Sequence, residues 1–347
     1  MRSIYFITLL FLIACQSNNT SSTTQNLPAK KVYPTRGYIE KLHPSLDKVI
    51  STEAVIEQIG EGLVWSEGPL WLPSKRWLLC SDVKENKIHK WTEQEGLSVF
   101  LEPSGFTGTT TDSREKGSNG LTLDAEGNLV LCQHGDRRVV RYTGSFEEPS
   151  PSFTTLASQY KGQRFNSPND LIYDSKGNLY FTDPPFGLSE AMMDDPKKEL
   201  PFQGIYKYSP QGVLTLVSKI MSRPNGLALS PDEKTLYVSN ADVEQAIWMT
   251  FPVLENGLLG EGTLFHDATH LIGKEIGVPD GVKVDAQGNI FTAGPGGLWI
   301  FSPDGTVLGK IKPDAWVSNC NFDETGKVLF ITADDYLLRV KLQALNK

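Results

Sequence analysis

The strongest pattern in the chain is a short hydrophobic and polar phrase that recurs about every 50 residues. Each copy has an apolar strand, a polar turn such as DAEGN, DSKGN or DAQGN, and a second apolar strand such as LVLC, LYFT or IFTA. Asp, Ser and Gly supply the turn conformations that a tight hairpin needs, so the phrase predicts a β-hairpin. The copies begin at Glu67, Asn119, Asn169, Asn225, Asp280 and Ser318.

A repeat of this length with strand patterning is typical of a β-propeller that has one four-stranded blade per repeat. Further strand phrases between the hairpins, such as KIHKWT, GIYKYS and GLWIF, supply outer strands. The final phrase, YLLRVKL, leaves the sixth blade short, and the segment from Ala54 to Gly60 can complete it and remove a free edge. We therefore predict an all-β, six-bladed β-propeller whose ring is closed by an N-terminal strand. Five or seven blades are the competing counts.

In a propeller, equivalent positions of all blades point at one central axis, so side chains far apart in the sequence meet there. Four copies begin with an oxygen-bearing side chain suited to a metal: Glu67, Asn169, Asn225 and Asp280. Two carboxylates and two amide oxygens form a hard set of the kind that calcium accepts, and the lack of His at these positions disfavours zinc. Taken singly, an Asn or Asp before Gly is more often a turn residue. The group predicts a Ca²⁺ site, with Mg²⁺, Mn²⁺ or Zn²⁺ as alternatives.

Counting outward from each turn gives an expected register for the hairpins. It places Glu67 opposite Asp82, Asn169 opposite Asp183, and Asn119 near Gln133 and His134. Polar residues of the returning strands are therefore expected around the mouth that holds the ligand residues: Asp82, His134, Asp183, Asn240, Asp242 and Asp334.

Composition narrows the functional classes. The chain has 347 residues, 39% of them hydrophobic, which is ample for a core, and a net charge of −8. This acidic balance, without a cluster of Lys or Arg, argues against nucleic acid as a partner. Cys80, Cys132 and Cys320 each lie in or beside an apolar strand phrase, which predicts buried thiols; a disulfide between Cys80 and Cys132 is the alternative.

The N-terminus reads as the export signal of a bacterial lipoprotein. Arg2 supplies a short positive region, and the apolar run from Ile4 to Ile13 is too short to span a bilayer. The sequence LIAC that ends at Cys15 is typical of a lipobox, which predicts Cys15 as the lipidated first residue of the mature protein; an ordinary signal peptide with a coincidental Cys is the alternative. Gln16 favours the outer membrane, so we expect anchoring at its periplasmic face, with no other membrane contact.

These features divide the chain into three parts. Residues 1–14 form the signal peptide, residues 15–50 carry the lipid and a flexible tether, and residues 51–347 form the propeller. The tether assignment rests on the polar, Ser/Thr/Asn-rich stretch after Cys15, which has too few apolar side chains to order itself.

Several phrases resemble the gluconolactonase/regucalcin-like (senescence marker protein) lactonases, six-bladed propellers with a central divalent ion. They are SEGPLW (66–71), RFNSPND (164–170), FTDPPFG (181–187), RPNGLALS (223–230) and VPDG (278–281). The resemblance implies that Glu67, Asn225 and Asp280 are metal ligands, and that Asn169 contacts the substrate or a metal-bound water. Animal-type members have an Arg two residues before that Asn, where this chain has Ser167. Arg164, further back, fits loop bracing better than substrate contact.

The resemblance implies calcium-dependent hydrolysis of a small sugar lactone such as glucono-1,5-lactone. Asp280 is the candidate catalytic residue, as a general base or water-orienting group. Asn119, His134, Asn169 and Asp183 are the candidate substrate contacts, and a structural hydrogen bond is the alternative for His134. Two rival functions stay open, a phosphotriesterase-like or aryl-ester hydrolase on the same metal, and a surface-tethered binding propeller with a structural ion. A monomer or weak homo-oligomer is expected.

Overall fold

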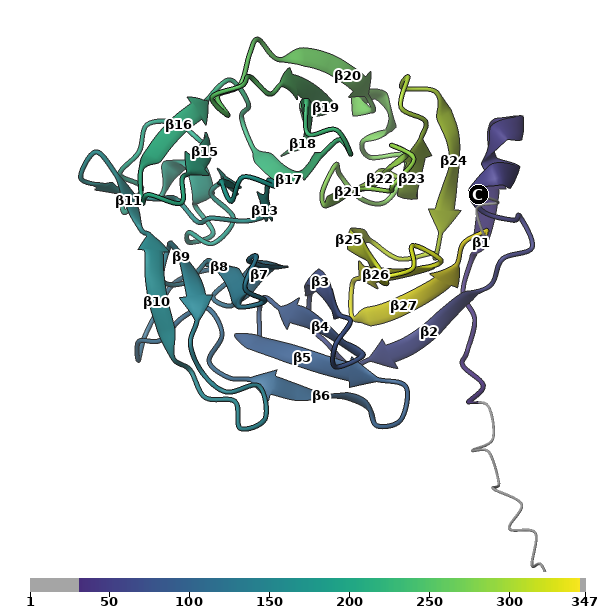
Figure 1. The fold of residues 1–347 in the computed structure, drawn as a ribbon, viewed down its shortest axis with the longest axis horizontal. Coiled ribbons are helices and arrows are strands. Elements are labelled where there is room, and N and C mark those ends of the chain that lie inside the picture. Colours follow the sequence, from purple (N-terminus) through teal and green to yellow (C-terminus); the bar gives the residue numbers. More distant parts are fainter. Residues whose placement is uncertain (1–30, 344–347) are drawn as a thin grey trace, which may run out of the picture. The chain divides into compact units, whose positions relative to one another are not determined.

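Six antiparallel sheets are arranged in a ring in a computed structural model of the protein, which describes residues 31–343 (Figure 1). The first blade contains β3 (Ser66–Leu72), β4 (Trp77–Asp82), β5 (Lys87–Thr92) and β6 (Gly96–Leu101). The second contains β7 (Ser118–Leu123), β8 (Leu129–Gln133), β9 (Arg138–Tyr142) and β10 (Phe153–Ala157). The third contains β13 (Leu171–Tyr173), β14 (Leu179–Asp183), β15 (Gly204–Tyr208) and β16 (Leu214–Ser218).

The remaining blades follow in chain order. The fourth contains β17 (Pro224–Leu229), β18 (Thr235–Asp242), β19 (Gln245–Pro252) and β20 (Thr263–Asp267). The fifth contains β21 (Val282–Val284), β22 (Ile290–Gly294), β23 (Gly297–Phe301) and β24 (Val307–Lys312). The sixth contains β25 (Val317–Phe322), β26 (Val328–Ala333), β27 (Tyr336–Lys341) and β2 (Ile56–Glu61). Outside the blades are the strand pair β11 (Gln159–Tyr160) and β12 (Gln163–Arg164) and the 3₁₀ turns η1 (Pro44–Lys48), η2 (Met192–Asp194) and η3 (Thr269–Leu271).

The predicted all-β propeller with six four-stranded blades is confirmed. The ring closes as expected, because β2 near the N-terminus pairs antiparallel with β27 near the C-terminus. This pairing covers the edge that the sixth blade would otherwise expose. The inner strands β3, β7, β13, β17, β21 and β25 are neighbours around the centre.

The propeller begins before residue 51, where the sequence placed its start. Residues from Tyr33 onward belong to the same compact unit as the blades. Within them, β1 (Tyr38–Lys41) adds a fifth strand to the fifth blade by pairing with β24. Leu46 and Ile50 are fully buried against that blade, so residues 33–50 are part of the propeller. The sequence did not predict this part of the propeller because its apolar residues are isolated from one another. They belong to one edge strand and one 3₁₀ turn, which show no repeating hydrophobic pattern.

Apolar side chains of adjacent sheets fill the space between blades. Trp71 of β3 stacks on Phe330 of β26 with ring centroids 5.2 Å apart, and Trp248 packs 5.6 Å from Trp299 of the next blade. Cys80, Cys132 and Cys320 are buried free thiols, so the alternative disulfide between Cys80 and Cys132 does not form.

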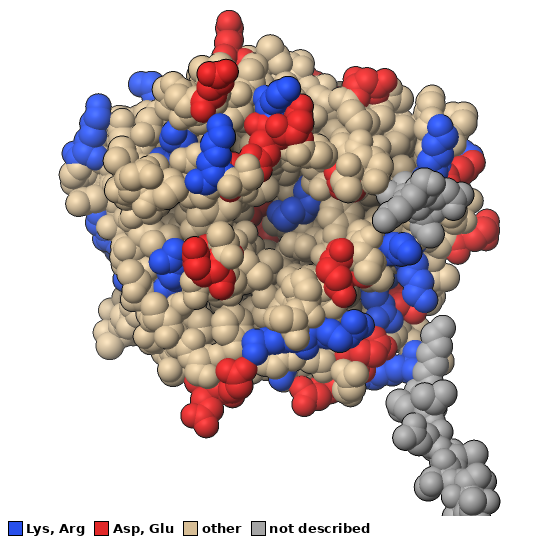
Figure 2. All heavy atoms as spheres, viewed as in Figure 1, with Lys and Arg blue, Asp and Glu red and all other residues tan. Residues whose placement is uncertain are grey.

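On the face drawn in Figure 2, the ring is hollowed at its centre, and Lys and Arg are interspersed with Asp and Glu. No helix within residues 31–343 is long and apolar enough to cross a membrane. The predicted signal peptide and Cys15 lie outside the described residues.

Candidate active site

A β-bulge sits where the candidate ligand residues enter the inner strands. In the first blade Glu67 pairs with Ser81, whereas Leu70 pairs with Leu79, so β3 carries one extra residue. The second and fourth blades have the same irregularity, between Ser118 and Leu121 and between Pro224 and Leu227. A bulge bends its strand and redirects side chains. The expected pairing of Glu67 with Asp82 is therefore wrong by one residue, and Ser66 pairs with Asp82 instead.

Hydroxyl groups from the preceding blade hold the main chain of the candidate site residues. Ser81 Oγ donates to the Asn119 carbonyl (2.7 Å), Thr182 Oγ1 to the Asn225 carbonyl (2.7 Å), and Ser239 Oγ to the Asp280 carbonyl (2.6 Å). Because each bond crosses between two blades, it fixes the site residues against one another. These carbonyls would otherwise be buried without a partner, which is costly.

Glycines follow Glu67, Asn225 and Asp280, and close packing rather than a turn requires them. A Cβ on Gly68 would lie 2.1 Å from the Asn119 carbonyl oxygen, and one on Gly226 would lie 2.5 Å from the Asp280 carbonyl oxygen. Gly68 also has a φ of +50°, which disfavours other residues. Adjacent inner strands can therefore approach closely only where these glycines occur.

The structure brings the predicted ligands together at one cavity of about 240 Å³. Glu67, Asn169, Asn225 and Asp280 come from four different blades, and all four are at least nine-tenths buried. The complete lining is Trp65, Glu67, Arg114, Glu115, Asn119, Asn169, Phe186, Asn225, Ala241, Val278, Asp280 and Trp316. The convergence that the repeat predicts is therefore present.

The two carboxylates of this set are electrostatically unusual. Burial raises the pKa of Glu67 to about 7, against the hydrogen bond from the Gly68 amide. Burial also raises the pKa of Asp280 well above its ordinary value, and the nearby charge of Glu67 adds to the effect. Two buried like charges repel each other unless a cation or protons lie between them.

The donor atoms fit a hard divalent cation. Asp280 Oδ1 and Asn119 Oδ1 are buried acceptors with no hydrogen-bond partner among the described residues. Buried polar atoms are normally paired, so such oxygens are free to coordinate an ion or accept from a ligand. No group of three or more His, Cys, Asp or Glu within residues 31–343 is arranged to hold a metal, so the candidate set depends on its amide oxygens.

A second polar layer supports Glu67 inside the channel. Asn319 Nδ2 donates to Glu67 Oε2 (3.2 Å), and Lys283 Nζ lies 3.4 Å from Asn319 Oδ1 and 3.5 Å from Asp170 Oδ2. Asn319, Lys283 and Asp170 were not predicted from the sequence, although Asp170 directly follows Asn169 and Lys283 lies three residues after Asp280.

The polar residues that were expected around the mouth do not line the cavity, and several of them accept hydrogen bonds from loop amides. Asp82 accepts from the amides of Val64 and Trp65, and Asp334 accepts from the amide of Trp316. Asp183 plays the same part in the third blade, because its carboxylate accepts from the amides of Asn166 and Ser167 and from the Asn166 side chain. Asn240 accepts from the amide of Arg223.

Asp183 is fully buried and is not one of the residues that line the cavity. Burial raises its pKa to about 7. The hypothesis that Asp183 contacts substrate therefore gains no geometric support, and we assign it to holding the loop before β13. The Asn169 amide donates to the Thr182 carbonyl, one residue before the Asp183 that the expected register places opposite Asn169.

His134 lies behind the cavity wall rather than on it. It is fully buried, its Nε2 is 3.5 Å from Asn169 Nδ2, and its Nδ1 is 3.4 Å from Glu115 Oε2. Asn169 and Glu115 both line the cavity, so His134 connects two lining residues without lining it itself. Of its two expected roles, the structural hydrogen bond fits this position.

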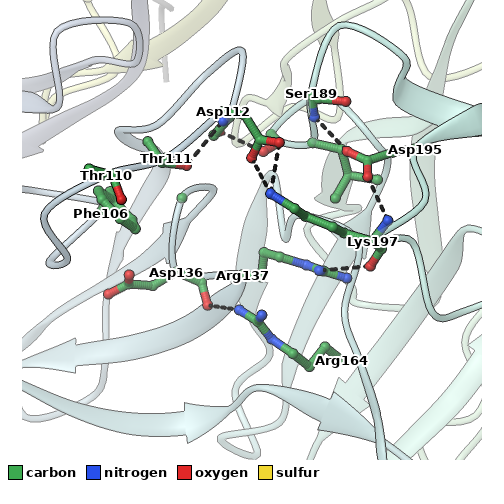
Figure 3. Close-up of a pocket in the computed structure, with 14 residues that line it drawn as sticks. Phe106, Thr110, Thr111, Asp112, Asp136, Arg137, Arg164, Ser189, Asp195 and Lys197 are labelled. Atoms are coloured by element: carbon green, nitrogen blue, oxygen red, sulfur yellow. Dashed lines mark hydrogen bonds and ion pairs between the residues drawn. The ribbon is translucent and has the colours of Figure 1, made fainter.

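Arg164 lines a separate outer cavity of about 220 Å³ and does not reach the central one (Figure 3). Its Nη2 donates to the Asp136 carbonyl, as expected of a loop-bracing residue. Across this cavity Lys197 Nζ bonds both carboxylate oxygens of Asp112, so the cavity contains balanced charges.

Ser167 Oγ bonds the Pro184 carbonyl and the Gly187 amide, which keeps it away from the central cavity.

Comparison with known proteins identifies the family of the chain. Residues 65–335 match the family model described as the SMP-30/Gluconolactonase/LRE-like region. The chain belongs to this family. The resemblance inferred from the sequence is therefore confirmed, and the match includes all four candidate ligand residues.

Individual members of the family and related proteins show the same relationship. A gluconolactonase of Zymomonas mobilis is 41% identical over 314 residues, which cover 88% of this chain and 86% of that protein. A solved gluconolactonase of Xanthomonas campestris superposes with a TM-score of 0.77 at 31% identity, covering 90% of this chain and 97% of that one. A lactonase of Staphylococcus saprophyticus is 28% identical over 236 residues, covering 55% of this chain and 68% of that protein.

Proposed function

We propose that the protein hydrolyses a small sugar lactone, such as glucono-1,5-lactone, with a calcium ion in the central cavity. Family membership and the 41% identical gluconolactonase support lactone hydrolysis. The observation that carries the site assignment is the meeting of Glu67, Asn169, Asn225 and Asp280 at one buried cavity. These four side chains would hold the ion.

A bound calcium ion would supply Lewis acidity for the lactone carbonyl oxygen. Asp280 would orient a water molecule and accept its proton, since its Oδ1 is a buried acceptor without a partner. Asn119 would position the substrate, because its Oδ1 is likewise free. Trp65, Phe186 and Trp316 supply an apolar part of the cavity wall, which would strengthen electrostatic interactions beside it.

The direct test is a pH-stat assay of glucono-1,5-lactone with the calcium-loaded protein, in parallel with a phosphotriester and an aryl ester. We expect lactone turnover to exceed turnover of the other two substrates. Faster turnover of the phosphotriester would assign the site to the rival hydrolase class. The absence of turnover of all three would favour the binding propeller.

We infer that the protein is a lipoprotein of the bacterial cell envelope, anchored through Cys15 at the periplasmic face of the outer membrane. The motif LIAC and the polar stretch that follows support this inference. Growth of expressing cells with a labelled fatty acid should label the wild-type protein and leave the Cys15→Ala variant unlabelled. Labelling of that variant, or a soluble wild-type protein, would contradict it.

A further inference from the structure

The loop between β6 and β7, residues 102–117, places two charged side chains in the central cavity. Arg114 and Glu115 line it close to the point where the chain enters β7. Glu67 and Asp280 are the other charged residues of the lining, and both belong to the candidate metal set. Arg114 and Glu115 are therefore the charged lining residues that the proposed metal site leaves without a role.

Both side chains have neighbours within ion-pair distance. Glu115 lies between Arg114, whose Nη1 is 3.6 Å from Glu115 Oε1, and His134, whose Nδ1 is 3.4 Å from Glu115 Oε2. Arg114 Nε is 3.6 Å from Glu190 Oε2, and its amide donates to the Leu188 carbonyl. His134 contacts Glu115, and the loop of Leu188 and Glu190 contacts Arg114. These neighbours are distant from the pair in sequence, so the fold positions both side chains at the cavity.

The neighbours of Glu115 are too far away to use its hydrogen-bonding capacity. Normal hydrogen bonds measure about 2.7–3.2 Å, whereas its contacts with Arg114 and His134 measure 3.6 Å and 3.4 Å. The side chain of Glu115 is only 10% exposed, so bulk water satisfies little of it. Its carboxylate can therefore accept from ligand hydroxyls, while the Arg114 guanidinium can donate to ligand oxygens.

The same cavity offers an apolar, aromatic surface. Trp65 and Trp316 form an edge-to-face pair with ring centroids 5.8 Å apart, and Phe186 and Val278 continue the lining. A volume of about 240 Å³ suits a small ligand. A polyhydroxylated ring matches this combination, because it presents C–H groups to aromatic surfaces and hydroxyl groups to charged side chains.

We propose that Arg114 and Glu115 bind the ring hydroxyls of the substrate and thereby select polyhydroxylated lactones over unsubstituted ones. This assignment rests on the proposed lactonase function. Specificity follows because an unsubstituted lactone would cover the Glu115 carboxylate without giving it any hydrogen bond. The selectivity thus comes from the loop before the second blade, outside the metal set.

Competing rates on a matched pair of substrates test the proposal. Glucono-1,5-lactone and δ-valerolactone have the same six-membered ring and differ in ring substituents. We expect the wild-type protein to prefer the sugar lactone, and Glu115→Gln and Arg114→Met to lower the ratio of the two kcat/KM values by about 10- to 100-fold. The loss should lie mainly in KM for the sugar lactone. Glu126→Gln, an exposed position on the β7–β8 turn of the same blade, is the matched control and should keep the wild-type ratio.

Binding of non-hydrolysable analogues keeps this test separate from the proposed reaction. Gluconolactam should quench the fluorescence of Trp65 and Trp316 at a concentration at least about tenfold lower than δ-valerolactam, and Glu115→Gln should remove the difference. An unchanged rate ratio in both variants, or equal affinity of the wild-type protein for the two lactams, would overturn the proposal. Sugar-selective lactam binding without turnover of either lactone would support it and refute the proposed hydrolysis.

Discussion

Replacing Asp280 with Asn should lower kcat/KM for the lactone by about 1,000-fold, because the change removes both a candidate ligand charge and the proton acceptor. The fold should survive. The Asp280 main chain is held by Ala293 and by the Ser239 hydroxyl, and neither bond involves the carboxylate. Asn also removes the repulsion between Asp280 and Glu67, so the melting temperature of the metal-free variant should equal or exceed that of the metal-free wild type.

The control is Asp304→Asn on the exposed turn between β23 and β24 of the same blade, which should keep wild-type turnover. Steady-state kinetics and thermal melts of all three proteins provide the comparison. Turnover by Asp280→Asn within threefold of wild type would refute the catalytic role of Asp280. A much lower melting temperature of Asp280→Asn would show that its carboxylate supports the fold instead.

Removing divalent ions should abolish lactone turnover and lower stability. Glu67 and Asp280 are buried together, so an ion that binds between them stabilises the folded state alone. An ion at 100 times its Kd contributes about 2.7 kcal/mol, which corresponds to about 5 °C in melting temperature. Activity should fall by about 100-fold or more after chelation.

Refilling the chelated protein with Ca²⁺, Mg²⁺, Mn²⁺ or Zn²⁺ in turn, with pH-stat rates and melts recorded for each, identifies the ion. Calcium should restore both quantities, because the donors are carboxylate and amide oxygens. Full turnover by protein shown by mass spectrometry to contain no metal would contradict the ion's role in the reaction. A stabilising ion without any effect on lactone turnover would favour the structural-ion rival.

The repeat allowed the blades and four candidate ligands to be predicted from the sequence. Each blade repeats the same strand pairing, so equivalent positions of the copies lie at equivalent places in the ring. Comparing the copies shows that Glu67, Asn225 and Asp280 each bring an oxygen-bearing side chain to the same position. The strand at 56–61 could be predicted as well, because the sixth repeat lacks a partner for its outer edge.

The register could not be predicted because a bulge leaves little trace in the sequence. Without the extra residue, Glu67 would face Asp82, as the turn-based count gives; the bulge moves Asp82 under the preceding loop. The glycines beside the ligands were read as turn signals. In the structure they allow neighbouring inner strands to approach, a requirement that depends on the next blade rather than on local sequence.

The residues of the cavity wall that lie outside the repeat were also missed. Arg114, Glu115 and Phe186 belong to loops of the second and third blades, and Trp316 precedes the sixth inner strand. Loops between blades differ in length and have no hydrophobic period, so nothing in the sequence aligns these residues with the ligands. Only the ring places them around one cavity.

Anomalous diffraction from crystals soaked in Mn²⁺ tests the central claim most directly, namely that side chains of separate blades hold one cation on the axis. We expect a single strong peak within about 2.0–2.6 Å of carboxylate or amide oxygens of Glu67, Asn225 and Asp280. Glu67→Gln should weaken that peak. A peak elsewhere in the molecule, with these three side chains uncoordinated, would contradict the account.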